Sequence, residues 1–141
     1  MDSNTAALVA LKHHEDVEGL FAAGRFDNAA YLAGYVIECG LKTLLLREGM
    51  PAAKQLGHDL PLMTGNALSL AVQMAPAIRR YRVPDSADFQ HIVAHWGPEE
   101  RYEATGFMDR AKAESRLRAV RETFTALIVP QLLDGTVRYH S

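Results

Sequence analysis

The sequence predicts an all-α fold, an up-and-down bundle of four long helices with a short fifth helix. Residues 28–47 are apolar almost throughout, which indicates one long helix buried on most of its sides. Residues 108–133 carry apolar side chains at helical spacing with charged residues between them, the pattern of an amphipathic helix. The chain also lacks the strict alternation of apolar and polar residues that predicts strands.

Composition indicates one ordinary globular domain over residues 1–141, with a core at about 5–134 and a polar tail at 135–141. Hydrophobic residues make up 48% and charged residues 23%, and the net charge of −2 argues against a surface that binds nucleic acid everywhere. A single cysteine, Cys39, excludes a disulfide framework and favours a reducing cytoplasm. The N-terminus lacks the features of a signal peptide, and charges inside the apolar run argue against a membrane span.

The first two helices are predicted to form an antiparallel hairpin. The first covers residues 5–23, is capped by Asn4 or Thr5, and is stopped by Gly24. The second is the apolar helix, with Asp27 or Asn28 as its cap and its end at residues 49–51. Because only a few residues connect them, the two helices must pack side by side.

The remaining helices follow from caps and breakers. Asp59 is a natural cap for a third helix that has Pro61 in its first turn and runs to about residue 74, with Gly65 and Asn66 as a weak point in its middle. A short helix is expected over 87–96, then a loop to residue 106. Asp109 stands early enough to cap the last helix, which Pro130 is expected to disturb.

Polar residues of the central helix lie on one line. Tyr31, Tyr35, Glu38 and Lys42 are spaced four, three and four residues apart, so they fall within a stripe about 60° wide. Buried charges need partners or a route to water. The stripe is therefore either a self-satisfied polar line that fixes helix register, or one wall of a polar cleft or dimer interface.

Four motifs together resemble one family. They are Gly24-Arg-Phe-Asp-Asn-Ala-Ala-Tyr31, the helix Tyr35-x-x-Glu38-x-x-x-Lys42, His58-Asp-Leu60, and the loop Trp96-Gly-Pro-Glu-Glu-Arg-Tyr102. In this order and at this spacing, the chain resembles the HEPN domains over about residues 5–130. The resemblance implies a four- to five-helix bundle that is often a homodimer.

The same resemblance implies a role with RNA or nucleotides. Many HEPN domains are metal-independent endoribonucleases, some are toxins paired with a nucleotidyltransferase antitoxin, and others bind RNA without cutting it. The nuclease members carry arginine, four to six residues and then histidine. This chain lacks that motif, because Arg82 to His91 is too long and Arg138 to His140 too short. We therefore expect an RNA- or nucleotide-binding domain of a toxin–antitoxin or defence system, with nuclease chemistry either lost or atypical. The alternative is a non-catalytic, dimeric interaction module that partners a nucleotidyltransferase.

Metal-independent RNA cleavage needs a base for the ribose 2′-hydroxyl and an acid or cation for the leaving group. The catalytic candidates are Glu38, Lys42, His58 and Arg101. The binding candidates are aromatic or cationic: Tyr31, Tyr35, Trp96, Tyr102, Arg79, Arg80 and Arg82.

Each candidate also has a structural interpretation. His58 could bond nearby backbone, and Trp96 could be a core anchor. Arg101 could fasten its loop through Glu38 or Glu100, and the basic run at 79–82 could be a solvated helix end. If Glu38 and Lys42 face a pocket with Arg101, the binding hypothesis gains, and if they close within the chain without a cavity, the interaction hypothesis gains.

Metal and cofactor sites are not expected. His91 and His95 have the i, i+4 spacing of metal ligands on a helix, but no third ligand is marked. The adjacent His13 and His14 point in different directions on a helix. There is no glycine-rich phosphate loop and no cysteine cluster.

Overall fold

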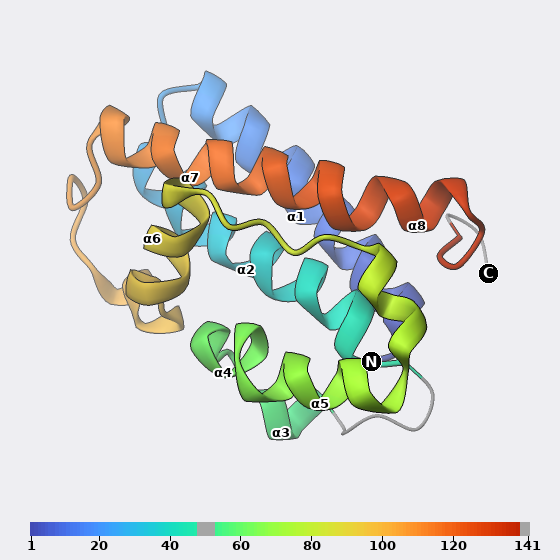
Figure 1. Cartoon of the computed structure of the whole chain (residues 1–141). Helices are drawn as coiled ribbons and strands as arrows, with labels where there is room; N and C mark the ends of the chain where they lie inside the picture. Colours follow the sequence, from blue (N-terminus) through green and yellow to red (C-terminus); the bar gives the residue numbers. More distant parts are fainter. Residues whose placement is uncertain (48–52, 139–141) are drawn as a thin grey trace.

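A computed structural model describes residues 1–47 and 53–138, and within these ranges all regular elements are helices, with no strands (Figure 1). The all-α prediction is therefore confirmed for the described residues. The α-helices are α1 Ser3–Ala22, α2 Phe26–Leu45, α3 Ala53–Leu56, α4 Leu60–Thr64, α5 Asn66–Met74, α6 Ala87–His95, α7 Arg110–Thr123 and α8 Val129–Leu133. Two 3₁₀ turns, η1 Pro76–Arg80 and η2 Pro98–Tyr102, and one π turn, η3 Phe124–Ile128, complete the series.

The second helix is the centre of the fold. Helix α1 packs along one side of α2, the continuous α7–η3–α8 rod packs along another, and α4, α5 and η2 also contact α2 (Figure 1). Of the 20 residues in α2, 14 are buried, including Glu38 and Lys42. A helix this apolar can be stable in water only when neighbours cover most of its surface, so the prediction of a central buried helix is confirmed.

The predicted caps of the hairpin are wrong. Helix α1 begins at Ser3, and the Asp2 carboxylate accepts a hydrogen bond from the Thr5 N–H at 2.7 Å. Helix α2 begins at Phe26 without a side-chain cap. Both helices start earlier than predicted. Asp2 rather than Asn4 or Thr5 caps α1. The Asp27 carboxylate does not cap α2, because it accepts hydrogen bonds from the distant loop at residues 106–108. The predicted end of the central helix at residues 49–51 lies outside the described residues.

The predicted third helix is two short helices. Asp59 caps α4 as predicted, accepting from the Leu62 N–H at 2.9 Å. The chain then breaks at Gly65, whose φ of −106° and ψ of −108° are not helical, and continues as α5. The pair together occupies residues 60–74, in place of the single long helix that the sequence predicts.

The last helix contains a wide turn ahead of Pro130. Asp109 caps α7 as predicted, and the π turn η3 leads without interruption into α8. Proline has no N–H to donate, and its ring crowds the carbonyl one turn earlier. The wider turn accommodates both effects, so the expected disturbance takes the form of a π turn in a continuous rod.

The segment after α8 is only partly a polar tail. Val137 is buried, and its N–H donates to the Gln131 carbonyl at 3.0 Å. The Arg138 N–H donates to the Asn4 side chain at 2.7 Å. Residues 135–138 therefore fold back onto α8 and the start of α1, whereas residues 139–141 lie outside the described part. None of the described helices has both the length and the apolar character needed to cross a bilayer.

Candidate functional site

Two glycines of α2 admit close neighbours. A Cβ on Gly40 would lie 2.7 Å from the methyl carbon of Thr123 on α7, and one on Gly34 would lie 1.9 Å from the ring of Trp96. The Trp96 indole N–H donates to the Tyr31 carbonyl at 2.8 Å. These two glycines thus allow close approach to α2, by a helix at Gly40 and by an indole ring at Gly34. Trp96 is buried, so it supports the neighbouring site residues from the core side.

The Glu38 carboxylate lies between Lys42 and His58 and contacts both. One carboxylate oxygen, Oε2, lies 2.9 Å from Lys42 Nζ, and the other, Oε1, lies 2.6 Å from His58 Nδ1. Lys42 also donates to the Gly57 carbonyl at 3.1 Å. Glu38 and Lys42 are buried, but half of the His58 side chain is exposed. We call these three residues the Glu38 cluster.

The short connection between α3 and α4 positions His58. Gly57 has a φ of +56°, a left-handed conformation that glycine adopts without steric cost. This turn brings the Gly57 carbonyl to Lys42 and His58 to Glu38. The Asp59 cap then fixes the start of α4 immediately afterwards. The structural interpretation of His58, a bond to nearby backbone, is not what the structure shows, because His58 bonds to the Glu38 carboxylate.

Tyr35 links the cluster to the aromatic residues around it. Its ring centroid lies 5.6 Å from that of His58 and 4.9 Å from that of Trp96, both edge-to-face. Its hydroxyl shares a hydrogen bond of 3.0 Å with the Tyr31 hydroxyl. Burial and then this hydrogen bond raise the pKa of the Tyr35 phenol well above its ordinary value. Tyr35 therefore stays protonated and acts as a neutral hydrogen-bonding group.

The loop after Trp96 is fastened to α2 through Arg116. The Arg116 guanidinium makes a bidentate pair with Glu100, at 2.6 and 2.8 Å, and donates to the Ala30 carbonyl at 3.0 Å. The Asp27 carboxylate accepts from the backbone N–H groups of Gly106, at 2.6 Å, and Met108, at 2.9 Å. Both ends of the loop are thus bound to the first turns of α2.

Arg101 makes neither of the pairs suggested from the sequence. Glu100 is occupied by Arg116, and Glu38 by Lys42 and His58. Arg101 is exposed, and its guanidinium lies 4.8 Å from the ring centroid of Tyr102. The hydroxyl groups of Tyr102 and then Tyr31 raise the pKa of Arg101. Arg101 therefore lies over the Tyr102 ring and near Tyr31 of α2.

The structure gathers most of the predicted site residues on one face. Contacts run from Tyr31 to Tyr35, from Tyr35 to His58 and from His58 to the buried charges, and Arg101 lies near enough to Tyr31 for that residue to raise its pKa. We call the open part of this surface the Tyr35 face, consisting of Tyr31, Tyr35, His58, Arg101 and Tyr102. It combines aromatic rings, a cation and an imidazole above a buried acid and base.

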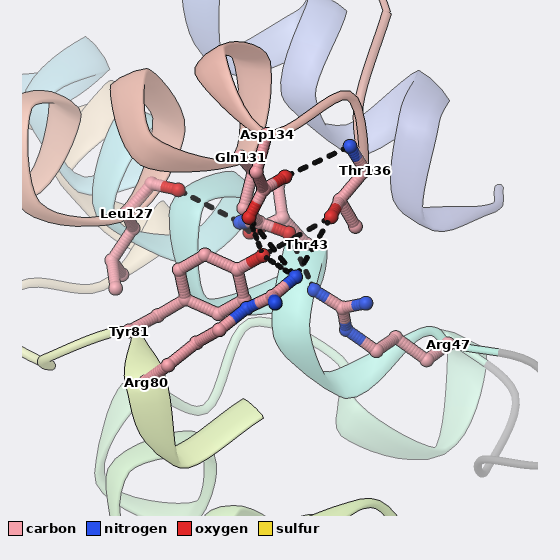
Figure 2. A network of polar contacts seen from close by, with 8 residues as sticks. All are labelled: Thr43, Arg47, Arg80, Tyr81, Leu127, Gln131, Asp134 and Thr136. Carbon is pink, nitrogen blue, oxygen red and sulfur yellow. Dashed lines mark hydrogen bonds and ion pairs between the residues drawn. The ribbon is translucent and has the colours of Figure 1, made fainter. Parts of the chain in front are cut away.

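The basic run at 79–82 lies elsewhere, near the C-terminal end of α2 (Figure 2). Arg80 pairs with Asp134 at 3.0 Å, and its guanidinium lies 4.9 Å from the ring centroid of Tyr81. The Tyr81 hydroxyl donates to the same Asp134 carboxylate. Arg79 and Arg82 are exposed. The three arginines predicted to bind nucleic acid are thus not joined to the Glu38 cluster, and the charge of Arg80 is already compensated.

A buried amide completes that second network. Gln131 accepts from Arg47 at 2.8 Å and donates to the Thr43 hydroxyl at 2.6 Å and the Leu127 carbonyl at 2.8 Å (Figure 2). Hydrogen bonds from Thr136 and then Tyr81 lower the pKa of Asp134 to about 2. These bonds tie α2, η1 and α8 together, so the network closes the end of the bundle.

Two residues of the site were missed from the sequence. Arg116 follows Ala113 by three residues and precedes Val120 by four, at the edge of the apolar face of α7, which was the available signal. His13 lies beside Tyr35, with ring centroids 5.9 Å apart, and its Nδ1 is buried without a partner among the described residues. Burial, and then the nearby charge of Lys12, lowers the pKa of His13.

The Tyr35 face is an open surface. Glu38, Lys42 and Arg101 line none of five hollows on the described part of the chain. A hollow of about 540 Å³ lies beyond His58, between α4 and α6, and its lining is mostly apolar. The rings of His91 and His95 lie 4.4 Å apart, but the described residues contain no group of three or more side chains that could hold a metal ion.

Comparison with family models, with curated proteins and with solved structures gave no match for this chain. The HEPN resemblance therefore still rests on the four motifs of the sequence. The function must be argued from the chemistry of the Tyr35 face and the Glu38 cluster.

Proposed function

We propose that this chain is a HEPN-like domain that binds RNA on the Tyr35 face and cleaves it there without a metal ion. One observation carries the proposal: buried Glu38 holds the half-exposed imidazole of His58 at 2.6 Å. A carboxylate that accepts from Nδ1–H fixes the tautomer of a histidine, so that Nε2 is the nitrogen free to take a proton. This arrangement presents a base at the surface.

The neighbouring groups supply the other needs of RNA cleavage. His58 takes the proton of the ribose 2′-hydroxyl, whose oxygen bonds to the phosphorus as the P–O5′ bond breaks, leaving a 2′,3′-cyclic phosphate. Exposed Arg101 stabilises the negative charge that develops on the phosphate and on O5′, which takes its proton from water. Lys42 holds the Glu38 carboxylate in place. Tyr31 and Tyr35 offer hydroxyl groups and ring edges to the nucleotide. These roles replace the arginine–histidine motif that the chain lacks.

The proposal includes the family arrangement. In a HEPN-like bundle, α1, α2 and the α7–η3–α8 rod are three of the four columns, and α4 with α5 is the fourth, broken at Gly65. The proposed setting is a cytoplasmic homodimer in a toxin–antitoxin or defence system, with a nucleotidyltransferase as antitoxin.

A second candidate is a non-catalytic interaction module that dimerises or binds a nucleotidyltransferase through the same face. The observation that favours it is the closure of Glu38 and Lys42 within one chain. Both are buried, they bond to each other and to the 57–58 turn, and they line none of the hollows described above. In this case the cluster fixes the position of the turn, and the exposed rings contact a protein.

The test is a binding and cleavage assay on total RNA, with and without EDTA. The variants are Arg101→Ala and His58→Ala, and His91→Ala serves as a matched control because it is an exposed histidine of α6 outside the site. The proposal expects EDTA-resistant cleavage that both site variants abolish and the control keeps.

The outcomes separate the candidates. Binding without cleavage, weakened in Arg101→Ala, reduces the proposal to an RNA-binding domain that has lost its chemistry. Absence of both binding and cleavage in the wild type overturns the proposal and favours the interaction module. In that case the oligomeric state of the wild type, compared with that of Arg101→Ala, is the next measurement.

A further inference from the structure

Tyr102 is an exposed aromatic residue on an anchored turn. Its exposed fraction is 77%, and it closes the 3₁₀ turn η2. Loop side chains are often exposed because loops are more mobile than the elements they connect. The structure fastens this turn at three points, so its exposure is not explained by a loose loop.

The first anchor is Trp96, just before the turn, which fills the space above Gly34. The second is Glu100, inside the turn, which is bound by both nitrogens of buried Arg116. The third is Asp27, which accepts two backbone N–H groups beyond the turn. Arg116 is the only one of these groups that contacts the turn itself and α2 together, through Glu100 and the Ala30 carbonyl.

One face of the Tyr102 ring is already occupied. The Arg101 guanidinium lies over it, 4.8 Å from the ring centroid, which is the geometry of a cation–π contact. Among the described residues, no other aromatic ring packs on Tyr102 and no other cation lies over its ring. The second face is therefore available to a flat ligand, with a cation beside it.

We propose that Tyr102 stacks an unpaired base of single-stranded RNA, that Arg101 binds an adjoining phosphate, and that Arg116 is the positioning residue that holds both through Glu100. This inference rests on the proposed function and names its ligand class. Aromatic platforms next to cations accept bases of any sequence, provided that the base is not already stacked in a duplex. A paired A-form helix cannot offer a base face to Tyr102.

The binding experiment compares a short oligouridylate with a blunt RNA duplex of equal length. Wild type is expected to bind the single strand more tightly. Tyr102→Leu is expected to weaken that binding about tenfold, because stacking on an aromatic ring is worth roughly this factor or more per base. Tyr102→Phe, which keeps the ring but loses the hydroxyl beside Arg101, is the matched comparison and is expected to retain most of the single-strand binding that Tyr102→Leu loses.

The positioning role has its own variants. Arg116→Lys keeps the charge but loses the bidentate geometry, so it is expected to weaken single-strand binding in the same direction. The double variant with Tyr102→Leu is expected to lose less affinity than the sum of the two single losses, because part of the Arg116 effect acts through Tyr102 and the rest through Arg101. Arg121→Lys is the matched control, because Arg121 makes an equally short bidentate pair with Glu18, at 2.7 and 2.6 Å, on the exposed surface.

A second readout needs no RNA. Trypsin cuts after arginine, and the bond after Arg101 lies within the anchored turn. Arg116→Lys is expected to speed cleavage there, whereas Arg121→Lys is not. If Arg116→Lys fails to fold, Glu100→Gln loosens the same anchor and takes its place in both measurements.

Several results would overturn the inference. They are equal binding of single strand and duplex, an unchanged affinity in Tyr102→Leu, or strictly additive losses in the double variant. If Tyr102→Leu binds normally while Arg101→Ala does not, RNA binding on the Tyr35 face is supported, but base stacking on Tyr102 is contradicted. If the wild type binds neither RNA, both fall, and the trypsin result still decides whether Arg116 positions the turn.

Discussion

Two pairs of buried charges lie against α2, and they differ in one respect. Arg116 and Glu100 are both covered, with side-chain exposures of 4% and 10%, and both carboxylate oxygens are bound by the same guanidinium. In the Glu38 cluster, the pair of Glu38 and Lys42 is equally buried, but the third member, His58, is half exposed. One group of charges is closed, and the other opens to solvent through an imidazole.

The difference separates structural from chemical use of buried charge. Burying an ion pair rarely adds net stability, since desolvation offsets the attraction, but removing one partner leaves the other uncompensated. A closed pair therefore fixes geometry, here the position of the 98–102 turn. An open cluster can in addition exchange a proton with whatever binds at its surface.

Loss of Arg116 is expected to have the largest effect on stability. Arg116→Met leaves the Glu100 carboxylate and the Ala30 carbonyl without their partner, so the free energy of unfolding should fall by about 3–5 kcal/mol. Urea unfolding followed by circular dichroism measures this. A loss below about 1 kcal/mol would mean that the buried pair of Arg116 and Glu100 behaves like a surface pair. The distinction between a closed and an open group of buried charges would then be wrong.

Packing beneath the open cluster is the next test. In Gly34→Ala the new Cβ would meet the Trp96 ring at 1.9 Å, and such overpacking should destabilise the fold by about 1–3 kcal/mol. Gly19→Ala is the matched control, since nothing lies within 4 Å of its Cβ position. That substitution should stabilise α1 by about 0.5–1 kcal/mol. Thermal unfolding of both variants measures these changes. If Gly34→Ala leaves the stability unchanged, the Trp96 ring can move aside and the packing is looser than expected.

Removal of His58 should separate stability from activity. His58→Ala deletes the exposed member of the cluster, where water can replace it, so the expected loss of unfolding free energy is only about 1 kcal/mol. RNA cleavage, if the proposed function is right, should disappear completely. A loss as large as that of Arg116→Met in the same urea experiment would instead place His58 in the closed class.

The smallest effect is expected at the exposed pair of Arg121 and Glu18. Arg121→Ala should lower the free energy of unfolding by less than about 1 kcal/mol, despite hydrogen bonds as short as those of Arg116. The hydrogen bond from Arg121 lowers the pKa of Glu18, so the pair stabilises the fold above the ordinary carboxyl range and loses this effect as the pH falls through it. Unfolding of wild type and variant between pH 6 and pH 3, about the range over which carboxyl groups titrate, should therefore converge at the acid end.

Most of the helices could be predicted from periodicity. The apolar patterns of 28–47 and 108–133 indicate buried helix faces whichever elements pack against them. The caps at Asp59 and Asp109 were also local signals. The start of α2 could not be found in this way, because Asp27 bonds residues about eighty positions away. Gly65 and Asn66 marked a weak point in the predicted third helix, but composition alone does not show that the helix breaks there.

The site was partly predictable for the same reason. The spacing of Tyr31, Tyr35, Glu38 and Lys42 places them on one line of a helix, and the structure keeps them there. The residues of other elements that contact this line of α2 could not be identified from the sequence. The structural interpretation of Arg101 paired it with Glu38 or Glu100, but Arg116 binds Glu100. Only the packing of α7 against α2 decides between these two arginines.

Trp96 has a practical consequence for work on this protein. It is the sole tryptophan of the chain, it is buried against Gly34, and its ring lies 4.9 Å from that of Tyr35. Emission excited at the red edge of protein absorbance therefore comes from a single indole directly beneath the Tyr35 face. Quenching or a spectral shift on adding a ligand would report occupancy of that face without any label, and the same signal would follow its loosening during denaturation.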